Sequence, residues 1–161
     1  MGKKITVIGA GGTGCCAAGV FTLHGHDVTL CEETGVCEQN IQDILDRGGF
    51  ELTGAADKGY APFTNITHDF ASAVKGSEYI IITALSTRHD ALIRKIVPYL
   101  EDGQVIMFSA GSCGSIAFRA VMKELGVEKN VLVGELEGNL FPCRIRGKAT
   151  GYIGMPAGKP W

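Results

Sequence analysis

Short runs of apolar, often β-branched residues alternate along the chain with longer segments whose apolar residues recur every three or four positions. The first pattern predicts strands buried in a parallel sheet, and the second predicts amphipathic helices. The expected strands cover about residues 3–8, 27–31, 79–83, 104–108 and 130–134. The expected helices cover about residues 12–24, 36–47, 69–74, 88–98 and 116–125. This alternation is typical of a doubly wound α/β fold, in which a mainly parallel sheet carries helices on both faces.

Four shorter segments lie outside the alternation. Residues 50–54 and 60–63 are expected to pair as short strands, and residues 141–146 and 150–154 to form a closing hairpin. Threonine hydroxyls accept hydrogen bonds from the first N–H groups of helices. Thr67 and Thr87 are therefore the expected caps of the third and fourth helices.

A glycine-rich turn, Gly9-Ala10-Gly11-Gly12-Thr13-Gly14, directly follows the first expected strand and opens the first expected helix. Its spacing, G-x-G-x-x-G, is the motif of dinucleotide-binding βαβ units of the Rossmann type. Gly9 allows the sharp turn, Gly11 allows the backbone to approach a pyrophosphate, and Gly14 allows the helix to pack closely on the strand. The motif alone is weak, because a glycine-rich turn can be only a turn. Its context here favours a cofactor site formed by Gly9, Ala10, Gly11, Gly12, Thr13 and Gly14.

An acidic residue in the expected position strengthens this interpretation. Glu32 ends the second expected strand, 18 residues after Gly14, where a carboxylate can accept hydrogen bonds from the adenosine ribose. Glu33 adds a second negative charge, and no basic residue follows in sequence before Arg47. A 2′-phosphate would be repelled there, so we expect NAD to be the cofactor and NADH to bind at least about tenfold tighter than NADPH.

Ligands in doubly wound sheets bind outside the carboxyl ends of the strands. We expect the loops 9–14, 32–33, 84–89 and 109–114 to surround one crevice, with Ala84, Leu85 and Ser86 near the nicotinamide half of the cofactor. His89 has the pattern of a surface histidine more than that of a ligand.

For one further loop and one set of charged residues, the sequence allows both a functional and a structural role. The loop 109–115 either offers amides to an anion or only connects a strand to a helix. Glu135, Glu137 and Arg144 either line the crevice or form a surface ion pair, and the second alternative is favoured. The residue types alone support no nucleophile-and-base pair, so no catalytic residue is assigned.

Composition narrows the class of protein. The 161 residues suit one domain, and a net charge of −2 excludes a basic surface for nucleic acid or acidic membranes. The six cysteines contain no C-x-x-C pair, and Cys15, Cys16 and Cys31 fall in expected core elements, so we expect neither a metal site nor disulfides. We also expect no signal peptide, no membrane span and a cytoplasmic protein.

The chain resembles the N-terminal domain of the opine (octopine/nopaline) dehydrogenase family. The resemblance rests on residues 5–11, 25–32, 98–104 and 135–144 and on a histidine at position 89. It implies reduction, by NADH or NADPH, of the imine formed from an α-keto acid and an amino compound. It also implies a second, helical domain that supplies the catalytic histidine. Leu85 stands where the family usually has proline, and 109–111 where it usually has Asn-Pro-Gly.

We therefore expect residues 1–161 to form a dinucleotide-binding domain without the family's C-terminal substrate domain, able to bind cofactor but not to turn it over. Two alternatives stay open. The chain is a stand-alone NAD(H)-binding or sensing module, or it is a domain of a related 6-phosphogluconate- or glycerol-3-phosphate-type dehydrogenase. Surface that a second domain normally covers would favour a homo-oligomer.

Overall fold

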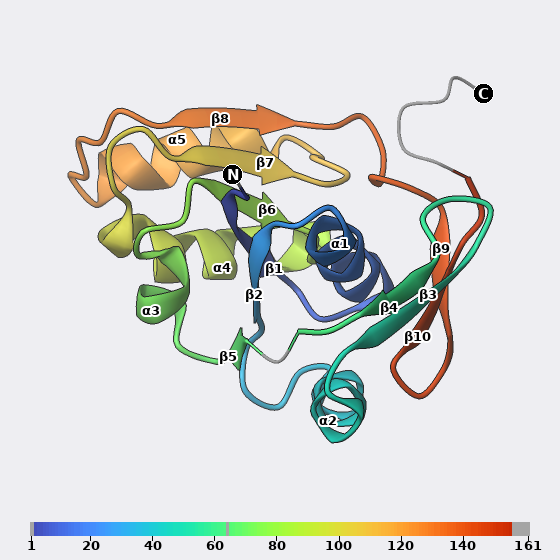
Figure 1. The fold of residues 1–161 in the computed structure, drawn as a ribbon. Coiled ribbons are helices and arrows are strands. Elements are labelled where there is room, and N and C mark those ends of the chain that lie inside the picture. Colours follow the sequence, from blue (N-terminus) through green and yellow to red (C-terminus); the bar gives the residue numbers. More distant parts are fainter. Residues whose placement is uncertain (1, 64, 156–161) are drawn as a thin grey trace.

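The computed structural model describes residues 2–63 and 65–155, which form two sheets and five α-helices (Figure 1). The main sheet has six strands in the order β5-β2-β1-β6-β7-β8, and every neighbouring pair is parallel. Its strands are β1 (Lys4–Ile8), β2 (Asp27–Cys31), β5 (Ile66–Thr67), β6 (Tyr79–Ile82), β7 (Val105–Phe108) and β8 (Leu132–Glu135). The predicted Rossmann-type α/β fold is confirmed.

Helices cover both faces of the main sheet (Figure 1). The helices are α1 (Gly12–Leu23), α2 (Glu38–Arg47), α3 (Phe70–Val74), α4 (His89–Ile96) and α5 (Gly114–Glu124), with 3₁₀ turns η1 (Ser86–Arg88) and η2 (Val97–Tyr99). Along each strand, successive side chains point to opposite faces of the sheet, as the pleat requires. Val7 and Ile81 belong to the core on the α1 side, whereas Ile80 and Ile82 belong to the core beneath α3, α4 and α5.

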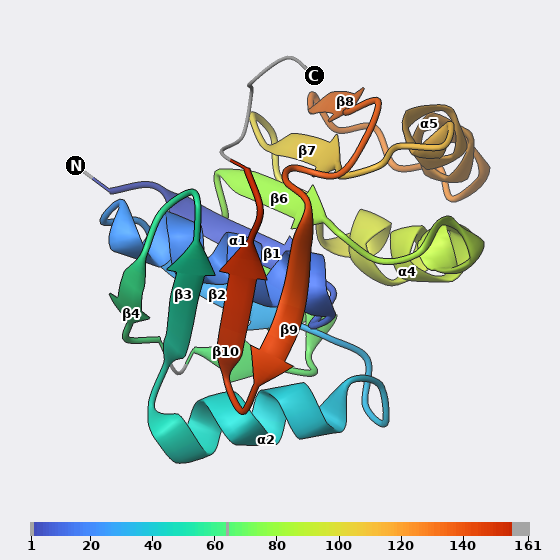
Figure 2. The same cartoon turned by 90° about the vertical axis from the view of Figure 1, so that its right-hand side faces the viewer.

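A second sheet packs on the outer side of α1 (Figures 1 and 2). Its strands, in the order β4-β3-β10-β9, are β3 (Phe50–Gly54), β4 (Gly59–Ala61), β9 (Cys143–Gly147) and β10 (Thr150–Ile153). The predicted strand pair and the predicted hairpin are both present. Their union, through the parallel pairing of β10 with β3, is not predictable from either segment alone.

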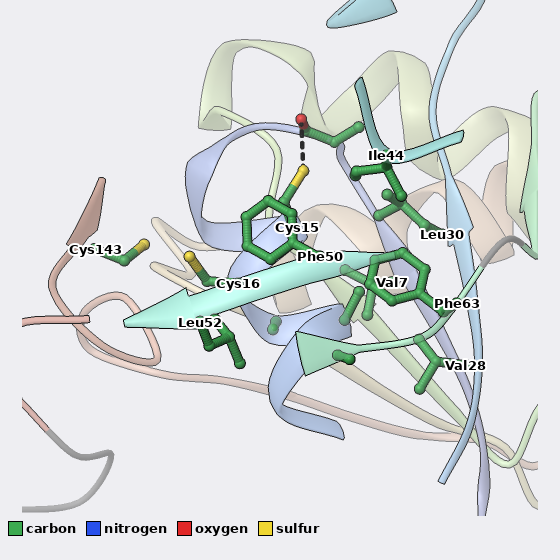
Figure 3. Packing of buried hydrophobic residues seen from close by; sticks show 14 of the residues in the cluster. Val7, Cys15, Cys16, Val28, Leu30, Ile44, Phe50, Leu52, Phe63 and Cys143 are labelled. Carbon is green, nitrogen blue, oxygen red and sulfur yellow. Dashed lines mark hydrogen bonds between the residues drawn. The ribbon is translucent and has the colours of Figure 1, made fainter. Parts of the chain in front are cut away.

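Small residues in α1 allow it to lie between the two sheets. Its residues 14–19 are all buried, and none is larger than cysteine. Figure 3 shows Phe50 of β3 against Cys15 and Cys16, with Val7 of the main sheet close by. A Cβ added to Gly151 of β10 would lie 2.5 Å from Cys16 Sγ. The close approach of the second sheet therefore limits side-chain size on both sides of the contact.

Three local predictions need correction. β8 is an edge strand rather than a buried one, and Leu132 is 67% exposed. Asp69, not Thr67, caps α3, because its carboxylate accepts a hydrogen bond from the Ala71 N–H at 3.0 Å. Thr87 lies inside η1 and caps no helix by its side chain. The position of β8 depends on strand order in the sheet, and the two caps depend on where the turns before α3 and α4 begin.

Cys15, Cys16 and Cys31 are buried as predicted. Within residues 2–63 and 65–155, no helix has the length and apolar character needed to cross a membrane.

Candidate functional site

The glycine turn between β1 and α1 is tightly closed at two of its glycines and open at a third. Gly9 has a φ of +112°, which L side chains rarely adopt. A Cβ on Gly14 would lie 1.7 Å from the Gly9 carbonyl oxygen, so only glycine lets α1 start so close to the strand. A Cβ on Gly11 would meet nothing within 4 Å, so the turn faces open space there. The first N–H groups of α1 are available at this point, because the first turn of a helix lacks intrahelical acceptors.

A cavity of about 340 Å³ lies at the carboxyl ends of β1, β2 and β6. It is lined by Gly9, Gly11, Gly12, Thr13, Glu32, Val36, Cys37, Thr83, Ala84, Leu85 and Arg88. Seven of these residues belong to the predicted site, and three predicted residues are outside the lining: Ala10, Gly14 and Ser86. The first is fully buried, the second packs against Gly9, and the third is exposed at the start of η1.

Glu32 is fixed at the end of β2, beside the turn, and is only 1% exposed. Its Oε2 accepts a hydrogen bond from the Ala10 N–H at 2.9 Å, and its Oε1 accepts from the Glu33 N–H at 2.8 Å and from Arg88 Nη2 at 3.1 Å. A carboxylate offers about four acceptor positions. Three protein donors therefore leave capacity for one further donor, such as a ribose hydroxyl.

Two basic residues meet the carboxylates at the end of β2, and neither was predicted from the sequence. Arg88 Nη2 donates to Glu33 Oε2 at 3.0 Å as well as to Glu32, and Lys95 Nζ donates to Glu33 Oε1. Lys95 and Arg88 together lower the pKa of Glu33. The β2 loop itself has no basic residue before Arg47, as predicted, but η1 and α4 supply two cations from a distant part of the chain. The two carboxylates are therefore not the unbalanced negative charge that the sequence suggested.

Thr83 connects the end of β6 to the glycine turn. Its hydroxyl lies 3.1 Å from the Ile8 carbonyl oxygen and 3.2 Å from that of Gly9. After it, Ala84 is half-buried and Leu85 is 75% exposed, and both line the cavity. A polar residue that ends a central strand beside a glycine turn is the signal by which Thr83 could have been found.

His89 is buried rather than on the surface, contrary to the prediction. It is 4% exposed, its Nε2 lies 3.1 Å from the Ala84 carbonyl oxygen, and its ring packs on Phe108 with centroids 4.9 Å apart. It therefore holds the loop after β6 against the core beneath α4 and α5.

The loop after β7 is not part of the cavity lining, so three of the four strand-end loops come together there. Two of its amides are already used: Ala110 N–H donates to the Gly138 carbonyl and Gly111 N–H to the Leu136 carbonyl, each at 2.9 Å. This favours a structural connection over an anion site. Glu135 accepts a hydrogen bond from the Ser115 hydroxyl at 2.9 Å.

The other charged residues near the last strands, Glu137 and Arg144, are exposed, as is Glu135, and none of the three lines the cavity. In the described part of the chain, neither glutamate forms an ion pair with Arg144. The favoured surface ion pair is therefore not seen there.

Comparisons with known proteins agree with this geometry. Residues 5–134 match the family model of ketopantoate reductase PanE/ApbA. An opine dehydrogenase from Arthrobacter sp. (strain 1C) is 31% identical over 143 residues, which cover 88% of this chain and 39% of the relative. The resemblance to opine dehydrogenases is confirmed, whereas the match to ketopantoate reductases was not foreseen from the motifs.

Solved structures share the fold. An octopine dehydrogenase solved with NADH and pyruvate superposes with a TM-score of 0.76 at 17% identity, over 96% of this chain and 41% of that one. A yersinopine dehydrogenase with bound NADP⁺ gives 0.72 at 15% identity, over 95% and 39%. The chain thus spans about two fifths of the length of these relatives.

Proposed function

The chain belongs to the ketopantoate reductase PanE/ApbA family, and we propose that within it residues 1–161 are the dinucleotide-binding domain of an opine-type dehydrogenase. The observation that carries this proposal is the glycine turn. Its backbone is closed toward the strand at Gly14 and open toward the cavity at Gly11, and Glu32 is fixed beside it. These features fit a pyrophosphate and the ribose next to it.

The cofactor would lie along the carboxyl ends of three strands. The amides at the start of α1 would face the pyrophosphate, and the Glu32 carboxylate would accept a ribose hydroxyl. Ala84 and Leu85, on the far side of the cavity, would lie toward the nicotinamide. The three predicted site residues outside the lining would not contact the cofactor. They would support its site by shaping the backbone around it: Ala10, Gly14 and Ser86.

In the whole enzyme, the bound cofactor would supply a hydride to the imine of an α-keto acid and an amino compound. The relative named opine dehydrogenase and the octopine dehydrogenase solved with NADH and pyruvate support this substrate class. The 161-residue chain by itself is expected to bind the dinucleotide without turnover, since Glu32, the carboxylate in the cavity lining, is held by Ala10, Glu33 and Arg88 and would face the ribose rather than the nicotinamide.

NAD(H) is the proposed cofactor in preference to NADP(H). The reason differs from the simple repulsion inferred from sequence, because Arg88 and Lys95 balance the two carboxylates. Glu33 already contacts both cations, so a 2′-phosphate bound between them would have to displace its carboxylate. We expect this displacement to make the affinity for NADPH about tenfold weaker than the affinity for NADH.

Titration of the purified chain with NADH and NADPH, followed by calorimetry, tests both statements. Saturable binding of one equivalent of NADH supports the domain assignment, and no binding of either dinucleotide to the folded chain contradicts it. Equal affinities, or tighter NADPH, would contradict the cofactor preference alone.

A second candidate follows from the family match over residues 5–134, namely a domain of an enzyme that reduces a 2-oxo acid without an amine. The two candidates share the cofactor and differ in the substrate. The natural gene product, identified by intact mass, should consume NADH with an α-keto acid only when an amino compound is present. Equal consumption without the amine would favour the second candidate.

A further inference from the structure

Two cations and two carboxylates form a compact network at the end of β2. Arg88 of η1 contacts both Glu32 and Glu33 through Nη2, and Lys95 of α4 contacts Glu33. Lys95 Nζ also lies 5.6 Å from the centroid of the Phe70 ring, which holds the ammonium on this side of α4. Neither cation comes from the β2 loop itself. Arg88 lines the cavity together with Glu32, whereas Glu33 and Lys95 lie outside its lining.

The two carboxylates are held with different firmness. Glu32 is buried and accepts two backbone N–H groups besides Arg88. The side chain of Glu33 is 37% exposed, and within the described residues its carboxylate accepts only from Arg88 and Lys95. Because Glu33 lacks the backbone donors that fix Glu32, it can turn to solvent while Glu32 stays in place.

Arg88 keeps unused capacity for an anion. Its two side-chain bonds both use Nη2, and within the described residues Nε and Nη1 have no acceptor. A guanidinium binds phosphate oxygens through two parallel N–H groups, and an ammonium adds a point charge. Glu33 carboxylate oxygens now occupy the place between these two cations that phosphate oxygens would take.

We propose that Glu33 sets the cofactor preference of this site by occupying Arg88 and Lys95, and that these two cations become a 2′-phosphate subsite once Glu33 is neutral. The inference rests on the proposed function, since it needs the adenosine ribose beside Glu32. Arg88 and Lys95 are then specificity-determining residues that a view limited to the β2 loop would not identify.

The test compares four forms of the chain by calorimetry with NADH, NADPH, ADP-ribose and 2′-phospho-ADP-ribose. The forms are wild type, Glu33→Gln, Glu33→Gln with Arg88→Gln, and Glu124→Gln as the charge-matched control. Glu124 is an exposed acid paired with Arg94, the neighbour of Lys95 on α4, so its neutralisation changes the net charge equally without touching the network. Thermal unfolding of each form verifies that it is folded.

We expect Glu33→Gln to raise the affinity for both 2′-phosphorylated ligands by about tenfold and to change the affinity for NADH by less than about threefold. Adding Arg88→Gln should remove the gain, and Glu124→Gln should not reproduce it. If NADH binds but Glu33→Gln raises NADPH affinity no more than Glu124→Gln does, the inference is overturned and the proposed function stands. If the folded wild type binds neither dinucleotide, the proposed function fails and the inference with it.

Discussion

The two faces of the main sheet are covered in opposite ways. On one face α1 lies between two sheets, and its buried residues 14–19 are glycine, alanine and cysteine. On the other face α4 and α5 fill the space with large side chains. Phe118 of α5 is fully buried there and meets the Phe108 ring edge to face, with centroids 6.1 Å apart.

This difference separates two kinds of constraint. The start of α1 tolerates no added atoms, because the backbone of the glycine turn lies directly against it. The α4–α5 face tolerates no removed atoms, because its stability comes from buried apolar volume. The candidate cofactor site adjoins the first face, so cofactor binding should respond to changes in α1 and be nearly indifferent to changes in α5.

The largest expected effect is on the α5 face. Phe118→Ala leaves a cavity beside Phe108 and should lower the free energy of unfolding by about 3–5 kcal/mol. Urea denaturation measures the loss. Phe118→Leu should lose roughly half as much free energy of unfolding, because leucine fills part of the volume that alanine leaves empty. The NADH affinity of the remaining folded protein should change by less than about threefold, since Phe118 is not part of the cavity lining. A large loss of affinity in a variant that is fully folded would mean that the two faces are coupled.

A substitution in the glycine turn, Gly14→Ala, should cost less stability than Phe118→Ala but should weaken NADH binding much more. Gly14→Ala places a methyl group 1.7 Å from the Gly9 carbonyl oxygen, a backbone atom that cannot rotate away. The start of α1 must shift, at a cost of about 2–3 kcal/mol, and its amides then no longer converge on one phosphate position. NADH affinity, measured by titration below the unfolding temperature, should fall by more than about tenfold. Unchanged affinity would show that the cofactor does not depend on this turn.

The local parts of this architecture are readable from sequence. β1, β2 and α1 follow from apolar runs and a glycine turn, because hydrophobic periodicity and glycine conformation are properties of neighbouring residues. The run of small residues in α1 is itself evidence that something packs closely on its outer side, which the second sheet explains. The acidic residue at the end of β2 is equally legible, since its position follows from the motif.

The remaining features depend on contacts between distant residues. Arg88 meets Glu32 and Glu33 from 56 and 55 positions away, and only because η1 folds back over the end of β2. β10 joins β3 through partners such as Thr150 and Glu51, which lie 99 positions apart (150 − 51) in the sequence. The apolar run that forms β8 reads like a central strand, because strand order in the sheet, rather than local pattern, leaves Leu132 exposed at the edge. The hydrophobic pattern of one segment carries no information about which distant segments lie beside it in the fold.

The smallest expected effect sharpens the comparison within α1 itself. Gly19→Ala is the same substitution in the same helix, and it gains the same helix propensity, about 1 kcal/mol. Its methyl group would meet Leu52 Cδ1 at 3.1 Å, the end of a side chain that can shift, rather than a backbone oxygen. We therefore expect stability within about 1 kcal/mol of wild type and unchanged NADH affinity. If Gly19→Ala and Gly14→Ala lost equal stability and equal affinity, α1 would be intolerant of any added carbon. The specific contact between Gly14 and Gly9 would then not explain the turn.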